Sequence, residues 1–211
     1  MRIAHKPTKL LITGSSGTGK TTFVLRYLTG TLADRVLIYD WQGEFAERLG
    51  LTPQPLNFAA LGDHADAHRV TVCDPALTEC PAGEGLARFA VFCREYARNL
   101  PNNGTALIVV DELHRLQDTN AAGVPPEFVD VLEFGRRDGL DAVMVSQAPN
   151  LLHNRIRNQI TEAVVFRLID ARAAGWLEPL GFDLDAIREQ RSGSYIYRNT
   201  ETGLTLTGRV F

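Results

Sequence analysis

Short apolar runs alternate with longer amphipathic stretches along most of this chain. Several runs are apolar throughout, which is typical of strands buried on both faces of a parallel sheet. Because the two patterns follow one another repeatedly, the sequence predicts βαβ units and a doubly wound α/β fold with helices flanking the sheet. The predicted strands are Leu10–Thr13, Val36–Asp40, Arg69–Cys73, Ala106–Asp111, Ala142–Ser146 and Ala163–Leu168. The predicted helices are Lys20–Leu28, Glu44–Leu49, Gly83–Asn99, Glu127–Arg137 and Leu151–Ile160.

The last part of the chain has a different pattern. Ser194–Arg198 and Leu204–Arg209 alternate in polarity and flank the turn residues Asn199–Gly203, which predicts a β-hairpin at the edge of the sheet. Gln117–Pro126 is the clearest predicted loop. No repeat or interdomain linker interrupts the chain, so we expect residues 1–211 to form a single domain.

Composition and charge narrow the class of protein. Apolar residues make up 45% of the chain, charged residues 22%, and the formal net charge is −3. The chain is therefore no polycation, and a contact with nucleic acid would be made locally by a few Arg and Lys side chains. Its three cysteines favour neither a disulfide framework nor a zinc site, and they indicate a reducing, cytoplasmic compartment. No run approaches the roughly 20 apolar residues of a membrane span.

A phosphate-binding loop follows the first predicted strand. The residues Gly14-Ser15-Ser16-Gly17-Thr18-Gly19-Lys20-Thr21 match the pattern G-x-x-x-x-G-K-[ST], and the amphipathic helix that begins at Lys20 follows them. The glycines allow backbone N–H groups to surround a phosphate, and the helix N-terminus adds positive potential. Lys20 is expected to reach the β- and γ-phosphates and Thr21 to ligate Mg²⁺, with Thr22 completing the binding segment.

Two adjacent carboxylates end the apolar strand Ala106–Asp111. In P-loop proteins a strand of this kind lies beside the phosphate loop, and Asp111 then holds Mg²⁺. Glu112 is placed to act as general base on the attacking water, with Glu44 as the next carboxylate to test. The Asp-Glu pair favours hydrolysis over a kinase reaction, which needs no such base. A solvated strand end would carry the same residues without a function.

An amide and two arginines complete the candidate catalytic residues. Gln147 follows the strand Ala142–Ser146 and would face the γ-phosphate if this strand neighbours that of Asp111; a turn residue before Pro149 explains it equally well. Arg136 and Arg137 end a predicted helix, where a cation is favourable without any function. The alternative is an arginine finger that reaches the nucleotide of a neighbouring subunit.

Together these motifs resemble the FtsK–HerA superfamily of DNA-pumping ATPases, which includes viral genome-packaging ATPases, and Zot-type assembly proteins of filamentous phages are similar. Besides the phosphate loop and the Asp111-Glu112 strand end, two more specific segments carry the resemblance. Leu37–Phe45 is similar to a D-x-x-G-E-[YF] segment that follows the second strand, through Asp40, Gly43 and Glu44. Arg136–Pro149 is similar to an R-x-x-G segment whose strand ends in Gln, with Pro close behind.

The resemblance implies a RecA-like P-loop NTPase that uses ATP and Mg²⁺. It makes Gln147 the sensor amide and Arg136 the preferred arginine finger. Family members form rings, most often hexamers, with double-stranded DNA in the central pore. The chain lacks the membrane segment and accessory domain of cellular FtsK and the transmembrane helix typical of Zot proteins. In outline it is closest to packaging ATPases of tailless, membrane-containing phages and archaeal viruses, which implies a capsid or portal-vertex partner and a location in the host cytoplasm or the virion.

Smaller features have simpler explanations. His64 and His68, beside Asp63 and Asp66, fit a solvated acidic loop better than a metal site, because no third ligand is evident. The aromatic residues Tyr39 and Trp41 fit the core better than a nucleotide contact. Arg155 and Arg157 fit a solvated helix face better than a DNA contact. In a ring, Arg115 and the loop Gln117–Pro126 would line the pore.

Two functions of different classes remain open. The first is a DNA translocase that packages a viral genome. The second is a Zot-like or secretion-type assembly ATPase that drives protein rearrangement and moves no DNA. A small-molecule kinase is disfavoured by Glu112 and Gln147 and by the absence of an arginine-rich lid segment.

Overall fold

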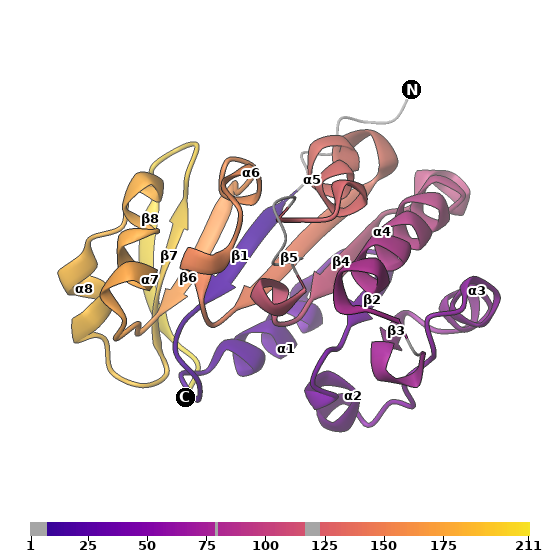
Figure 1. The fold of residues 1–211 in the computed structure, drawn as a ribbon, viewed down its shortest axis with the longest axis horizontal. Coiled ribbons are helices and arrows are strands. Elements are labelled where there is room, and N and C mark those ends of the chain that lie inside the picture. The colour runs from indigo at the N-terminus through magenta and orange to yellow at the C-terminus, as the bar shows by residue number, and fades with distance from the viewer. Residues whose placement is uncertain (1–7, 79, 117–122) are drawn as a thin grey trace.

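The computed structural model describes residues 8–78, 80–116 and 123–211. Eight strands form one sheet in the order β3-β2-β4-β5-β1-β6-β7-β8 (Figure 1). The first six strands are parallel, and β7 and β8 are antiparallel to their neighbours. The strands are β1 Lys9–Thr13, β2 Arg35–Tyr39, β3 Val70–Cys73, β4 Ala106–Val110, β5 Leu140–Ser146, β6 Glu162–Phe166, β7 Ser194–Asn199 and β8 Thr205–Arg209.

Helices follow most of the parallel strands. They are α1 Lys20–Gly30, α2 Glu44–Leu49, α3 Phe58–Ala67, α4 Ala82–Arg98, α5 Pro126–Asp138, α6 Asn154–Arg157, α7 Ala171–Gly175 and α8 Leu184–Glu189. Five single turns of 3₁₀-helix connect other elements: η1 Pro75–Leu77, η2 Pro101–Asn103, η3 Leu113–Arg115, η4 Pro149–Leu151 and η5 Glu178–Leu180. The mixed α/β architecture with a mostly parallel sheet and a hairpin at its edge is the predicted one.

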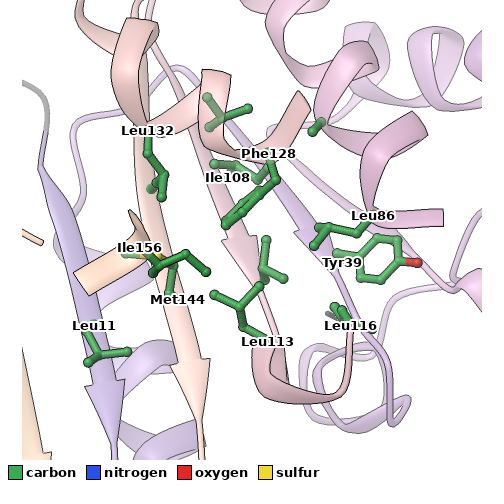
Figure 2. Packing of buried hydrophobic residues seen from close by; sticks show 14 of the residues in the cluster. Leu11, Tyr39, Leu86, Ile108, Leu113, Leu116, Phe128, Leu132, Met144 and Ile156 are labelled. Carbon is green, nitrogen blue, oxygen red and sulfur yellow. The ribbon is translucent and has the colours of Figure 1, made fainter. Parts of the chain in front are cut away.

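The strands form because their side chains are buried on both faces. On one face, α4 and α5 cover the sheet, and in Figure 2 the α5 residue Phe128 lies beside Ile108 of β4 in this larger cluster. On the other face, Val24 and Leu28 of α1 and Phe45 of α2 pack against the alternate strand residues. Every residue of β4 is buried, as the continuous apolar run predicts.

The strand order determines which loops meet. β1 pairs with β5 and β6, and β5 also pairs with β4. The strand that precedes Asp111, β4, is therefore separated from β1 by β5, and its carboxyl end still lies at the same edge of the sheet as the phosphate loop. The condition stated for Gln147, that its strand neighbours the strand of Asp111, is met, because β5 pairs with β4. All these parallel strands place their carboxyl ends at one edge of the sheet, where ligands bind in open α/β sheets.

Some predicted elements were wrong or missing. The helix predicted over residues 151–160 is only the short α6, preceded by η4, because Pro149 and His153 break the pattern at its start. The predicted acidic loop around His64 is part of α3, with Asn57 as its N-cap. The sequence analysis also missed α7 and α8. The predicted loop at 117–126 lies largely outside the described residues.

Among the described residues, no helix has both the length and the apolar character needed to cross a membrane. Within the same residues, no group of three or more His, Cys, Asp or Glu side chains is arranged to hold a metal ion. His64 instead shares a hydrogen bond of 3.0 Å between its Nδ1 and the Thr71 hydroxyl.

Candidate functional site

The phosphate loop connects β1 to α1 at the carboxyl edge of the sheet. Gly19 precedes the first helical residue with φ = +113°, a backbone conformation that favours glycine. A Cβ atom at this position would lie only 2.5 Å from a Val210 methyl group. Gly19 offers no side chain to cap the helix, so the backbone N–H groups of the first turn are available to an anion.

Lys20 is held against the loop that it follows. Its ammonium group donates a hydrogen bond of 3.0 Å to the Ser15 carbonyl oxygen, and the Thr18 hydroxyl donates to the same oxygen at 2.7 Å. Burial lowers the pKa of Lys20, while Glu112, Asp111 and other nearby carboxylates oppose this shift. The result is a buried cation at the position where phosphate charge would be received.

Asp111 follows β4 directly and is buried. Burial, reinforced by Glu112 and Asp40, raises its pKa to about 7. A carboxylate in this state is stabilised by a nearby cation, because a cation compensates the charge that burial penalises. Together with the Thr21 hydroxyl in the same cleft, Asp111 supplies the oxygen ligands that Mg²⁺ prefers.

Glu112 is also buried, and its backbone lies in the left-handed region at φ = +47°. The Gln147 amide donates a hydrogen bond of 2.6 Å from Nε2 to Glu112 Oε1. On the other side, the His114 Nε2 atom lies 3.3 Å and the Arg115 Nε atom 3.6 Å from Oε2. The pairing of β4 with β5 thus joins the candidate base to the candidate sensor amide directly.

A second carboxylate reaches the phosphate loop from α2. The Thr21 hydroxyl donates a hydrogen bond of 3.0 Å to Glu44 Oε2, and Arg48 lies 2.7 Å from Glu44 Oε1. The buried Asp40 side chain accepts a 2.8 Å hydrogen bond from the Ala46 N–H and so fixes the start of this helix. Sequence reasoning named Glu44 only as a substitute base; its place in the D-x-x-G-E segment was the signal that could have placed it here.

These residues line one cleft of about 350 Å³. Most of the predicted site residues meet there: Ser16, Gly17, Gly19, Lys20, Thr21, Thr22, Asp111, Glu112 and Gln147. The lining residues that the sequence analysis did not assign to the site are Gln42, Glu44, Arg48, Val145 and Phe211. Gly14, Ser15 and Thr18 belong to the same loop without lining the cleft. Figure 1 shows the end of the described chain, at Phe211, lying close to the loop before α1.

Arg136 does not line the cleft. It lies exposed in the last turn of α5, directly before β5, whereas Gln147 follows the opposite end of that strand. Seven strand residues at about 3.3 Å each separate these ends by roughly 20 Å. Arg137 is held by Asp138 at 3.3 Å and lies over the Phe134 ring at 5.2 Å. Among the described residues, Arg136 has no such hydrogen-bond or ion-pair partner.

Comparison with known proteins identifies the family. Residues 9–172 match the model of the family described as zonular occludens toxin (Zot). The chain belongs to the Zot family. With the phosphate loop and its flanking elements, this membership makes it a P-loop NTPase. A comparison with curated proteins found no match.

Solved structures share the fold of this Zot-family chain. The genome packaging NTPase B204 from Sulfolobus turreted icosahedral virus 2, in complex with AMPPCP, has a TM-score of 0.76 at 13% identity, over 96% of this chain and 97% of that one. The N-terminal domain of zonular occludens toxin from Neisseria meningitidis has a TM-score of 0.50 at 15% identity, over 97% and 94%. The type VII secretion ATPase EccC of Thermomonospora curvata has a TM-score of 0.63 at 20% identity, over 96% of this chain and 25% of that one.

Proposed function

We propose that this Zot-family chain is an ATP-hydrolysing motor that assembles into a ring, most simply a hexamer, and translocates double-stranded DNA to package a viral genome. The observation that carries the proposal is the near-complete mutual coverage with B204, 96% of this chain and 97% of that packaging NTPase. In this proposal the capsid or its portal vertex is the docking partner, and the motor acts in the host cytoplasm or on the virion.

The cleft supports a division of labour in hydrolysis. Lys20 and the loop amides hold the β- and γ-phosphates, and Thr21 and Asp111 would hold Mg²⁺. Mg²⁺, when bound, neutralises charge on the phosphate oxygens. Glu112 accepts a proton from the attacking water as that water bonds to the γ-phosphorus and the bond to the β–γ bridging oxygen breaks. Gln147, already bonded to Glu112 Oε1, orients the same water.

Arg136 fits a role in trans. It lies at the sheet edge opposite its own cleft, and within the part of the chain that the structure describes it has no ion-pair partner that would have to be displaced, unlike Arg137. In a ring, one subunit's α5 end would face the nucleotide of the next subunit, and its guanidinium would stabilise charge that develops in the transition state. An isolated monomer would then have an incomplete site.

The deciding experiment measures the ATPase rate with and without double-stranded DNA, alongside native mass in ATP. A ring-shaped mass and a rate that rises with DNA support the proposal. The Glu112→Gln variant serves as control, since it should bind ATP and assemble without turnover, and any residual rate then reports a contaminating ATPase. A rate that is unaffected by DNA, in rings that demonstrably form, contradicts DNA translocation.

The second candidate is an assembly ATPase that drives protein rearrangement and moves no DNA. The match to the Zot family over residues 9–172 is the observation that favours it. This function predicts an ATPase rate that is insensitive to DNA and that changes when a membrane-associated or virion assembly protein is added.

A further inference from the structure

His114 lies between the ends of two strands and contacts both. It is the middle residue of η3, two positions after Glu112, and its side chain is only 10% exposed. Its Nε2 atom lies 3.3 Å from Glu112 Oε2, and its Nδ1 atom shares a 3.3 Å hydrogen bond with the Ser146 hydroxyl at the end of β5. The imidazole therefore bridges the candidate general base and the strand that carries the sensor amide.

The surrounding groups determine which ring nitrogen carries the proton. Burial lowers the pKa of His114, which favours the neutral ring with a single N–H; Glu112 opposes this shift, and Arg115 and Lys20 reinforce it. The lone pairs of Glu112 Oε2 face Nε2 at 3.3 Å, so we place the N–H on Nε2. Nδ1 then accepts from the Ser146 hydroxyl, whose oxygen in turn accepts the Ala148 N–H at 3.2 Å.

The two oxygens of Glu112 are held differently. Oε1 accepts the 2.6 Å hydrogen bond from Gln147. Oε2 is buried and makes no hydrogen bond in the described structure, although His114 and Arg115 lie beside it. The Arg115 side chain is 57% exposed, so water competes for its guanidinium, whereas His114 is shielded. The position of Oε2 therefore depends mainly on the imidazole.

The backbone of Glu112 makes this support necessary. Its φ of +47° lies in the left-handed region, which is unfavourable for a non-glycine residue and persists only when neighbouring contacts enforce it. The backbone conformation of Glu112 therefore depends on contacts with neighbouring groups, and so does the orientation of its carboxyl group.

We infer that His114 is a positioning residue for hydrolysis, which keeps the Glu112 carboxyl group in the orientation in which Gln147 bonds Oε1. Through Ser146, the same contact links that orientation to the end of β5. The inference rests on the assignment of Glu112 as general base and is independent of whether the motor moves DNA.

The test replaces the imidazole by an apolar group of similar size. His114→Leu should lower kcat for ATP by about 10- to 100-fold, as expected for loss of a residue that orients a catalytic group. The Kd for ATP should stay within about twofold, because the interaction acts on the reacting water and not on ground-state binding.

His114→Gln should recover part of the rate, since its amide can donate to the same carboxylate. His64→Leu is the matched control, because His64 also bonds a hydroxyl through Nδ1 but lies outside the cleft.

A double-mutant cycle separates positioning from general destabilisation. In a Glu112→Gln background the His114→Leu change should lower kcat no further, because the base it positions is already gone. An equal fall in both backgrounds, or a loss that appears in the Kd for ATP, overturns the inference. A normal kcat for His114→Leu also overturns it while Glu112 keeps its role. A normal kcat for Glu112→Gln itself overturns the base assignment instead, so the two failures are distinct.

Discussion

At the scale of single residues, the site depends on charges that are buried before any ligand arrives. Lys20 is the clearest case, because its only hydrogen bond in the described structure is to the Ser15 carbonyl oxygen. We expect Lys20→Ala to raise the Kd for ATP by about 100-fold or more, since charge-assisted hydrogen bonds contribute about 1.5–3 kcal/mol each. Isothermal titration calorimetry measures this directly.

Lys9→Ala provides the matched control for Lys20. Lys9 is a partly buried lysine at the start of β1, away from the cleft, and it donates a 2.9 Å hydrogen bond to Gln159. Its removal should leave the Kd for ATP unchanged. An unchanged affinity in Lys20→Ala would mean that the loop amides bind the phosphates without the lysine.

At the scale of elements, one buried carboxylate joins α4 to α5. Asp138 accepts hydrogen bonds from Arg94 at 3.0 Å, from Arg98 at 2.8 Å and from Arg137 at 3.3 Å. Burial alone would raise its pKa, but the hydrogen bonds from these arginines outweigh it and leave the pKa below its ordinary value of 3.8. A lowered pKa in the folded state stabilises the fold above about pH 4, and this stability is lost as the pH falls through the folded-state pKa.

Asp138→Asn should therefore lower the free energy of unfolding by about 1–3 kcal/mol at pH 7. The difference from the unmodified protein should shrink towards zero at acid pH, once the pH has fallen below 3.8 and through the lowered pKa of Asp138. Urea unfolding at both pH values measures it. Asp130→Asn is the control: Asp130 bonds only Arg94 among the described residues and is 44% exposed, so its loss should cost less than about 1 kcal/mol. Equal losses at both pH values would show that the packing of the side chain matters and its charge does not.

At the scale of the whole molecule, the proposed role of Arg136 in trans would make ATPase activity a property of the assembly. Glu112→Gln subunits lack the base but offer Arg136, and Arg136→Ala subunits have the reverse defect. We expect each variant alone to bind ATP and to hydrolyse it slowly. For Arg136→Ala, the loss of the arginine should lower the hydrolysis rate about 10³–10⁵-fold. Mixed rings contain some junctions with both groups, so ATPase activity should partly return.

Arg137→Ala is the matched control for this mixing experiment, because Arg137 is the adjacent arginine of α5. Its loss should weaken the Asp138 interactions with little effect on turnover. If mixed rings form and stay as inactive as both parents, Arg136 is a helix-end cation and the trans role is wrong.

The sequence by itself determined the features that depend on neighbours along the chain. Continuous apolar runs specified buried strands, because a strand covered on both faces needs no polar positions. The glycines and Lys20 specified the phosphate loop, because backbone conformation and charge are local properties there. The short helices α3, α7 and α8 escaped prediction, since helices of this length are stabilised by packing more than by their own periodicity.

Only the tertiary structure decided which side chains meet. The insertion of β5 between β1 and β4 brings Gln147 within 2.6 Å of Glu112, and no spacing along the chain encodes that contact. The same holds for Glu44 against Thr21, 23 residues apart, and for Phe211 beside Gly19. Strand order follows from how the crossovers pack around a shared core, which is a property of the whole chain. Local sequence patterns therefore identified the reactive residues, and the fold determined which side chains they contact.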